Sequence, residues 1–401
     1  MNLLLTKRYI TLTPNNSTNE LINKIQTSKS FNSVNFCIEI HSILSKYKEY
    51  IDEHYEEWDK FKHYMNKYAL LNYNSFTQYY KPIALYEPIS RAYYKLWEIV
   101  YNFKLINKKT NLTYCALAEG PGGFVECFIN YRKRYYSEFI DNVFCMTLKK
   151  NNKYKNHEWN KIKHFMYKKK TKIKILYGTD QTGNLYNIEN ILYLYNTLPK
   201  CDFVTGDGGF DYSINFNKQE QLSYRLLFCE IVSAFCILKK GGHFILKIFD
   251  IHTNVTIQMI YLLNCLFKKL HIIKPFTSRP ANSEKYVICE SFKEITTVNL
   301  NILFDMVKKW ESVSKENLYI CNLFDFKISN SFKVVLSMAN YYFTRKQITS
   351  ILQTLYILNN KKEFYKLRND YLQKQVIYCL IWCELYDQNI NFKSKYLCLI
   401  K

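Results

Sequence analysis

A lysine and an aspartate stand at the ends of two apolar runs, where they could act together on a proton. Lys247 lies inside "FILKIFD", and Asp207 follows "DFVTG" and precedes two glycines. A charge within an apolar strand is costly unless it is paired or used. If the two runs are neighbouring strands, the pair forms a candidate site with an altered lysine pKa. Taken singly, Lys247 could equally be an edge-strand lysine or a partner of Asp250, and Asp207 a turn former.

A glycine-rich turn, "CALAEGPGGF" at 115–124, could hold a ligand against the main chain. Glycine lets a ligand approach the backbone closely. The spacing matches neither GxxxxGK[ST] nor GxGxxG, Pro121 interrupts the glycines, and Glu119 would repel a phosphate. The turn therefore favours a neutral or cationic ligand, the alternative being an ordinary strand-helix connection.

Short apolar runs that alternate with helical patterns must position these groups. Runs at 113–118, 142–148, 172–178, 201–207 and 243–250 indicate buried strands, with two more at 271–278 and 285–292. Residues 221–242 indicate a helix that ends at Gly241. This alternation predicts an α/β fold with a mostly parallel sheet and helices on both faces. Ligands then bind beyond the carboxyl ends of the strands.

Three regions differ in glycine content and in the spacing of apolar residues. Residues 1–75 lack glycine and carry helix-like segments at 20–27 and 49–71, which predicts a helical N-terminal region. Residues 76–298 hold the α/β pattern. Residues 299–401 lack glycine again, and apolar positions every three to four residues at 344–386 predict a helical C-terminal extension.

The formal net charge of +22 favours a polyanionic partner, either nucleic acid or an anionic membrane surface. The lysine-dense, aromatic-containing segment 149–175 would suit phosphates and stacked bases. The alternative is a solvated surface in a protein from an AT-biased genome. No apolar run approaches the roughly 18 residues of a membrane span, and the N-terminus does not resemble a secretory signal. We expect an intracellular protein.

The cysteines and histidines do not form a metal pattern. The thirteen cysteines lie in apolar stretches without a CxxC pair, and the eight histidines show no HExxH. We expect reduced core cysteines and no structural metal.

Five motifs occur together in one order along residues 85–295. They are "SRAYYKL" (90–96), "LAEGPGGF" (117–124), "TGDGGFD", "GGHFILKIFD" and "SRPANSEKYVIC" (278–289). In this combination the chain resembles the FtsJ-like RNA 2'-O-methyltransferases, and "DGGF" with "SRPANSE" is closest to the mRNA cap-specific branch of eukaryotes and large DNA viruses. The resemblance implies a Rossmann-like, S-adenosylmethionine-dependent methyltransferase sheet flanked by helices.

The family's catalytic tetrad transfers onto Lys95, Asp207, Lys247 and Glu284. Glu290 lies past the motif and is excluded. By this resemblance Lys247 activates a ribose 2'-hydroxyl, and the other three groups orient it in line with the methyl donor. A lysine does so only if its pKa falls toward neutrality, which a second nearby lysine promotes.

The resemblance also implies where the donor binds. The glycine turn would hold its amino-acid end, and Asn184, where cap-type relatives tend to have an aspartate, would read the adenine with Asp180 as a nearby substitute. The expected donor-binding residues are Ala118, Glu119, Gly120, Pro121, Gly122, Gly123, Phe124, Asp180, Asn184 and Asp207.

The implied activity is methylation of the ribose 2'-hydroxyl of a cap-proximal mRNA nucleotide. Capped mRNA is the implied partner, along with other capping enzymes such as a guanine-N7 methyltransferase, and we expect no membrane partner. The implied location is the cytoplasm, including a viral factory or virion, or the nucleus. Two alternatives stay open: 2'-O-methylation of ribosomal or transfer RNA, and an inactive RNA-binding or scaffold subunit of a capping complex.

Overall fold

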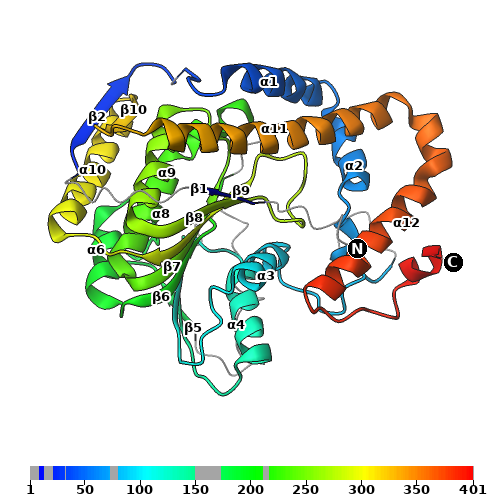
Figure 1. Ribbon diagram of the computed structural model, residues 1–401, viewed down its shortest axis with the longest axis horizontal. Helices are drawn as coiled ribbons and strands as arrows, with labels where there is room; N and C mark the ends of the chain where they lie inside the picture. The colour runs from blue at the N-terminus through cyan, green and yellow to red at the C-terminus, as the bar shows by residue number, and fades with distance from the viewer. Residues whose placement is uncertain are drawn as a thin grey trace.

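An eight-stranded sheet forms the centre of the molecule (Figure 1). The computed structural model describes residues 9–12, 21–31, 33–72, 80–149, 173–210 and 216–400. The strand order is β1-β8-β9-β7-β6-β3-β4-β5, and the five strands from β7 to β5 run parallel. The expected α/β class with a mostly parallel sheet is confirmed. The strands are β1 Tyr9–Leu12, β3 Thr113–Leu117, β4 Asn142–Met146, β5 Ile173–Leu176, β6 Cys201–Gly206, β7 Leu238–Ile248, β8 Phe267–Ile273 and β9 Lys285–Phe292.

Helices cover both faces of this sheet because successive strand side chains point to opposite sides. In β3, Cys115 and Leu117 join one apolar core, and Tyr114 and Ala116 join the other. The first core packs against α6 Ile188–Thr197, α8 Tyr224–Ile237, α9 Asn254–Leu266 and α10 Thr297–Lys315. The second packs against α3 Ala92–Phe103 and α4 Gly123–Tyr135.

The helix expected to end at Gly241 instead ends at Ile237, and β7 begins with the next residue. Gly241 has a φ of +79°, in the left-handed region, and the pairing of β6 with β7 shifts register between Cys201 and Phe203. Gly241 therefore lies at an irregular position within strand β7, where its left-handed conformation is needed, and it is not a helix cap.

The regions at both ends of the chain are mainly helical in their described parts, as expected, but both also contain short strands. β1 is the edge strand of the central sheet and pairs with β8, and β2 Asn23–Ser28 pairs with β10 Tyr319–Phe324 in a second sheet. The segment at 20–27, expected to be helical, is thus largely a strand, because pairing with a distant segment outweighs a weak local preference.

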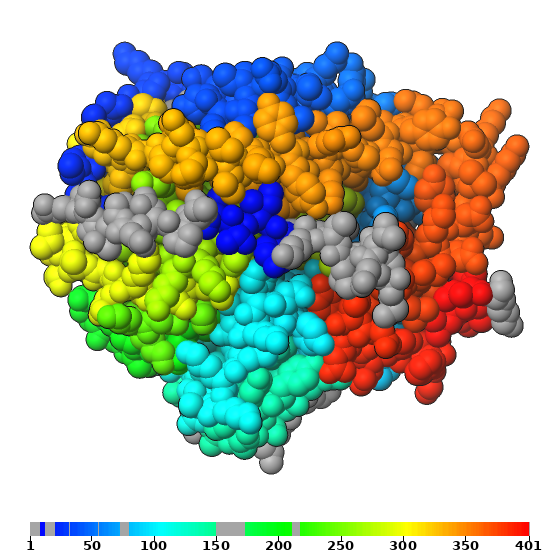
Figure 2. All heavy atoms as spheres, viewed as in Figure 1, coloured from blue at the N-terminus to red at the C-terminus, as the bar shows by residue number. Residues whose placement is uncertain are grey.

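Helices from the two ends of the chain pack on each other. α1 Ile38–Asp52 runs beside α11 Asn330–Asn359, and α2 Tyr55–Met65 lies between α11 and α12 Lys361–Leu385 (Figure 1). The helical pattern at 344–386 is confirmed. Figure 2 shows α12, in red, against the cyan segment that includes α3. The short elements are η2 Ala69–Leu71, η3 Phe216–Lys218, α7 Gln219–Leu222 and η4 Lys395–Ile400.

The cysteines are free thiols, and ten of the thirteen are buried, as expected for reduced core residues. Within the part of the chain that the structure describes, no helix is both long enough and apolar enough to span a bilayer.

Candidate active site

Four segments bring polar side chains to one edge of the sheet. Asp207 directly follows β6, Lys247 is the penultimate residue of β7, and the glycine turn follows β3. Glu284 precedes β9, which is antiparallel to β7 and pairs Lys285 with Ile248. The first residues of β9 therefore meet the carboxyl ends of the parallel strands, which places Glu284 at the same edge.

Lys247 and Asp207 form the first of two lysine-carboxylate pairs. Lys247 Nζ donates a hydrogen bond to the Asp207 main-chain oxygen at 2.7 Å and lies 3.3 Å from Asp207 Oδ1. The same carboxylate oxygen accepts a hydrogen bond from the Tyr286 hydroxyl at 2.9 Å. Tyr286 lies directly opposite Lys247 in the pairing of β7 with β9. Sequence reasoning missed Tyr286, since only the strand register reveals this position.

Lys95 and Glu284 form the second pair. Lys95, in the first turn of α3, places Nζ 2.8 Å from the Glu284 carboxylate, which also accepts a hydrogen bond from Ser278 Oγ at 2.8 Å. Burial alone would raise the pKa of Glu284, but Lys95 and Lys247 outweigh it and lower the pKa to about 2. Glu284 is therefore ionised at neutral pH.

The pKa of Lys247 is raised, contrary to the expectation that it falls. Burial lowers this pKa, but the carboxyl groups of Asp207, Glu284 and Glu230 together outweigh burial. The expectation considered the neighbouring lysine and omitted the carboxylates around Lys247. In the protein without ligands, Lys247 is an ammonium ion at neutral pH.

The glycine turn is braced by its own carboxyl group. Gly122 has a φ of +111°, and its N–H donates to Glu119 Oε1 at 3.0 Å. Glu119 Oε2 is buried and has no hydrogen-bond partner among the described residues. Burial and the nearby Asp207 raise the pKa of Glu119 to about 8. An unpaired buried carboxyl oxygen next to residues that line the hollow, Ala118 and Gly120, is chemically suited to an ammonium group.

Glu230 of α8 supports the second glycine turn, and sequence reasoning missed it. Its Oε1 accepts the Gly208 N–H at 2.9 Å, while Oε2 is buried without a partner in the described chain. Burial raises the pKa of Glu230 to about 8. A Cβ on Gly208 would lie 2.7 Å from Glu230 Oε1 and 2.8 Å from Ala118 Cβ, so only glycine fits there. A charged residue within the apolar run "LLFCEIVSAFCIL" was the available signal.

A hollow of about 340 Å³ lies where these groups meet. It is a polar site between the two glycine turns, open to a ligand. Its lining residues are Ala118, Gly120, Asp207, Gly209, Phe210, Gln219, Lys247, Phe249, Asn282 and Glu284.

Several expected site residues lie outside this hollow. The Asp180 carboxylate accepts hydrogen bonds from Thr182, Asn187 and Asn190, and Asn184 Oδ1 accepts one from the Tyr186 N–H. Both side chains thereby stabilise the loop after β5.

Two further side chains singled out from the sequence, Phe124 and Glu290, contact other parts of the protein and do not line the hollow. The Phe124 side chain is fully buried in the core. Glu290 Oε1 lies 2.8 Å from His271 Nε2. Most of the lysine-dense segment 149–175 lies outside the described residues.

Comparisons with known proteins agree with the motif pattern. Residues 88–292, about half of the chain, match the family described as FtsJ-like methyltransferase. Cap-specific mRNA (nucleoside-2'-O-)-methyltransferase 1 of Xenopus laevis is 36% identical over 216 residues, 51% of this chain and 24% of that protein. Cap-specific mRNA (nucleoside-2'-O-)-methyltransferase 2 of Drosophila melanogaster is 28% identical over 289 residues, 70% of this chain and 40% of that protein.

Among solved structures, a ribosomal RNA methyltransferase of Plasmodium falciparum aligns with a TM-score of 0.35 and 20% identity, over 51% of this chain and 98% of the other. The match to the Xenopus protein spans about a quarter of that protein, and the match to the Drosophila protein spans two fifths of it.

Proposed function

The chain belongs to the FtsJ-like methyltransferase family, and from this premise we propose that it methylates the ribose 2'-hydroxyl of a cap-proximal nucleotide of mRNA. The names of its relatives support mRNA as the substrate. The observation that carries the proposal is the convergence of two lysine-carboxylate pairs, Lys247 with Asp207 and Lys95 with Glu284, at one edge of the sheet.

S-adenosylmethionine supplies an electrophilic methyl carbon on a positively charged sulfur. The turn from Ala118 to Gly123 would hold its amino-acid end, because the glycines allow close contact with main chain. The unpaired Glu119 Oε2 would accept a hydrogen bond from its ammonium group.

Lys247 takes the proton of the ribose hydroxyl in this proposal. Its side chain is 12% exposed and lines the hollow beside Glu284, and Nζ is held by the Asp207 main-chain oxygen. The raised pKa means that Lys247 must first lose its own proton, and a positive charge entering the site lowers that pKa.

Asp207 and Glu284 hold the lysines and align the hydroxyl, and Lys95 keeps Glu284 ionised and in place. Alignment of this kind supplies a large part of a transfer rate. Tyr286 fixes the Asp207 carboxylate.

Capped mRNA is the proposed partner, and the formal net charge of +22 favours binding of a polyanion. Other capping enzymes are proposed as functional partners. The protein would act wherever mRNA receives its cap, in the nucleus or the cytoplasm.

Calorimetry of S-adenosylmethionine binding, followed by methyl transfer to capped and uncapped transcripts of one sequence, tests this proposal. We expect donor binding and faster transfer to the capped transcript. Glu284→Gln should lower kcat by at least about 100-fold, while Glu290→Gln, a carboxylate outside the tetrad, should leave it unchanged. Donor binding without turnover would instead support a scaffold, and equal transfer to both transcripts would contradict cap specificity.

A further inference from the structure

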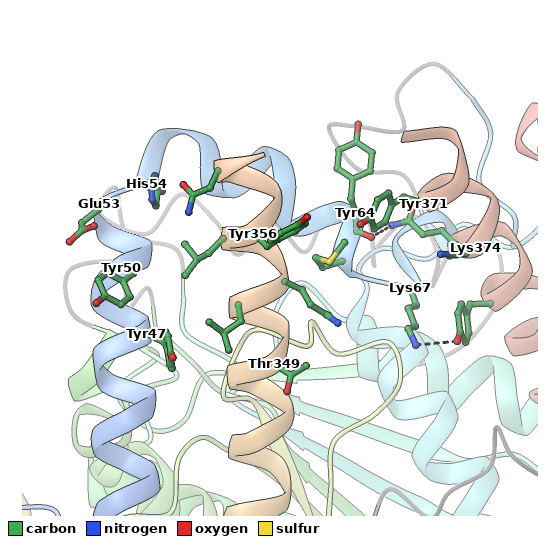
Figure 3. Close-up of a pocket in the computed structure, with 17 residues that line it drawn as sticks. Tyr47, Tyr50, Glu53, His54, Tyr64, Lys67, Thr349, Tyr356, Tyr371 and Lys374 are labelled. Atoms are coloured by element: carbon green, nitrogen blue, oxygen red, sulfur yellow. Dashed lines mark hydrogen bonds between the residues drawn. The ribbon is translucent and has the colours of Figure 1, made fainter. Parts of the chain in front are cut away.

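A hollow of about 1170 Å³ lies among α1, α2, α11 and α12, far larger than the one beside Lys247 (Figure 3). We call it the helical groove. The residues that line it fall within 47–67 and 349–378, outside the stretch 88–292 that matches the family. They are Tyr47, Tyr50, Glu53, His54, Tyr64, Met65, Lys67, Thr349, Leu352, Gln353, Leu355, Tyr356, Asn359, Tyr371, Lys374, Gln375 and Tyr378.

The lining combines aromatic rings with positive charge. It includes six tyrosines and two lysines, and Glu53 is the one acidic side chain among the described residues that line the groove. Tyr356 is 59% exposed, although it is a large ring on a helix face. Figure 3 shows Tyr47 and Tyr50 on α1, Tyr356 on α11, and Tyr371 with Lys374 on α12, so the rings come from several walls. Exposed rings beside ammonium groups are the surface that stacks bases and attracts phosphates.

A second hollow adjoins the groove and reaches the loop that carries Glu284. It measures about 340 Å³ and shares Met65, Lys67, Thr349 and Gln353 with the groove. It also contains Lys346, and it has no acidic residue among its described lining.

The far wall of this second hollow belongs to the loop that carries Glu284. Two of its lining residues bind that residue: Ser278 Oγ donates to Glu284 Oε1, and Lys274 Nζ donates to the Glu284 main-chain oxygen, each at 2.8 Å. The two hollows therefore lead from the tyrosine-rich surface to the back of a tetrad residue.

We propose that the helical groove is a binding site for single-stranded RNA, holding nucleotides of the substrate away from the one that is methylated. This inference rests on the proposed function and adds the place where the rest of the RNA chain binds. Lys67 and Lys374 contact phosphates, and Tyr356 provides a stacking surface for a base. Because the groove is built from both ends of the chain, it extends the RNA site beyond the family domain.

Fluorescence anisotropy of labelled single-stranded RNA tests the groove directly. The probes are an oligonucleotide of about ten nucleotides, within the range that single-strand sites cover, and a capped dinucleotide. The variants are Lys374→Glu and Tyr356→Ala. Their matched controls are Lys366→Glu, on the same helix, and Tyr365→Ala, whose ring is 61% exposed, because neither residue lines the groove.

We expect each groove variant to weaken binding of the longer RNA by about fivefold or more, and the controls to bind like the wild type. Binding of the dinucleotide and its methylation should not change in any of the four. The affinity for the longer RNA should also fall steeply with salt, and less steeply in Lys374→Glu.

Equal affinity of the groove variants and their controls for the longer RNA would overturn the inference, even if methyl transfer is observed. If the groove variants lose RNA affinity but no protein methylates RNA, the groove stands and the proposed reaction fails. The readout is binding, so the two outcomes are separate.

Discussion

The charge state of Lys247 is the central feature at the scale of single residues. Burial lowers its pKa, but the nearby carboxyl groups of Asp207, Glu284 and Glu230 outweigh burial and raise it. In the proposed reaction Lys247 accepts a proton, yet it is already protonated in the free protein. The proposed reaction therefore requires a lower pKa of Lys247, and a cationic ligand in the site would lower it.

The rate of methyl transfer should consequently rise with pH. As long as Lys247 stays mostly protonated, its deprotonated fraction grows up to tenfold per pH unit, until the pH reaches the pKa that Lys247 has with donor and RNA bound. Single-turnover rates at saturating donor and RNA, from about pH 6 to 9, measure this.

The variant Glu230→Gln tests whether the carboxyl groups raise the pKa of Lys247. It retains an oxygen for the Gly208 N–H but removes an ionisable carboxyl group near Lys247, so the pKa of Lys247 should fall. The increase of the transfer rate with pH should then occur at lower pH. A pH-independent rate in the wild type, or an unchanged pH dependence in the variant, would contradict the role of Lys247 as base.

Glu119 predicts a second pH effect, on donor binding. Its pKa is raised to about 8, so the carboxyl carries a proton at neutral pH. A cation bound at its free oxygen lowers that pKa, and the proton is released. Affinity for S-adenosylmethionine should therefore increase as pH rises toward 8.

Calorimetry in buffers of different ionisation enthalpy measures the released proton. Glu119→Gln should abolish most of the buffer dependence, while Glu290→Gln should leave it intact. Buffer-independent binding by the wild type would show that Glu119 does not meet the cation.

At the scale of elements, one buried carboxyl group, that of Glu98, joins three segments next to Lys95 and Glu284 of the proposed tetrad. Glu98, one turn after Lys95 on α3, accepts the N–H groups of Phe276 and Thr277 at 2.6 and 2.8 Å. It also accepts the Trp382 Nε1–H at 3.1 Å. α3, the loop that carries Glu284, and α12 of the C-terminal region are thus fastened at one point.

Replacing Glu98 should loosen this junction. Glu98→Leu leaves the buried N–H groups of Phe276, Thr277 and Trp382 without their acceptor, and each costs about 1–3 kcal/mol. We expect the free energy of unfolding to fall by about 3 kcal/mol or more, with kcat reduced because Glu284 loses its fixed position. Trp382→Phe removes one donor and should cost less.

Urea unfolding and steady-state kinetics of the same preparations measure both effects. An unfolding free energy of Glu98→Leu within about 0.5 kcal/mol of the wild type would show that the junction does not support the loop.

Elements whose signal is local were predictable, and those that depend on distant partners were not. The apolar run at 113–118 and its glycine turn identify β3 and its end, since both features lie in adjacent residues. β2 was mistaken for a helix because its partner, β10, lies about 300 positions away. Lys247 and Asp207 stood out as charges at strand ends, whereas Lys95 and Glu284 were found only through the family motifs. Tyr286, Glu230 and Glu98 required the packed structure.

At the scale of the whole molecule, the regions at both ends of the chain pack against the domain that matches the family, residues 88–292. β1 extends the central sheet, and Lys48 of α1 forms a buried ion pair at 2.9 Å with Asp250, just beyond β7. Helices from the two ends together enclose the helical groove (Figure 3). No local pattern could predict that groove, because its walls come from segments some 300 positions apart in the sequence.

Mapping the methylated atom in RNA is the most direct test of the account. Capped RNA is incubated with isotope-labelled S-adenosylmethionine and either the wild-type protein or Lys247→Ala, digested, and analysed by mass spectrometry. The account predicts label on the ribose 2'-oxygen of a cap-proximal nucleotide with the wild type, and at least about 100-fold less with Lys247→Ala. Label on a base, or equal labelling by the two proteins, would contradict it.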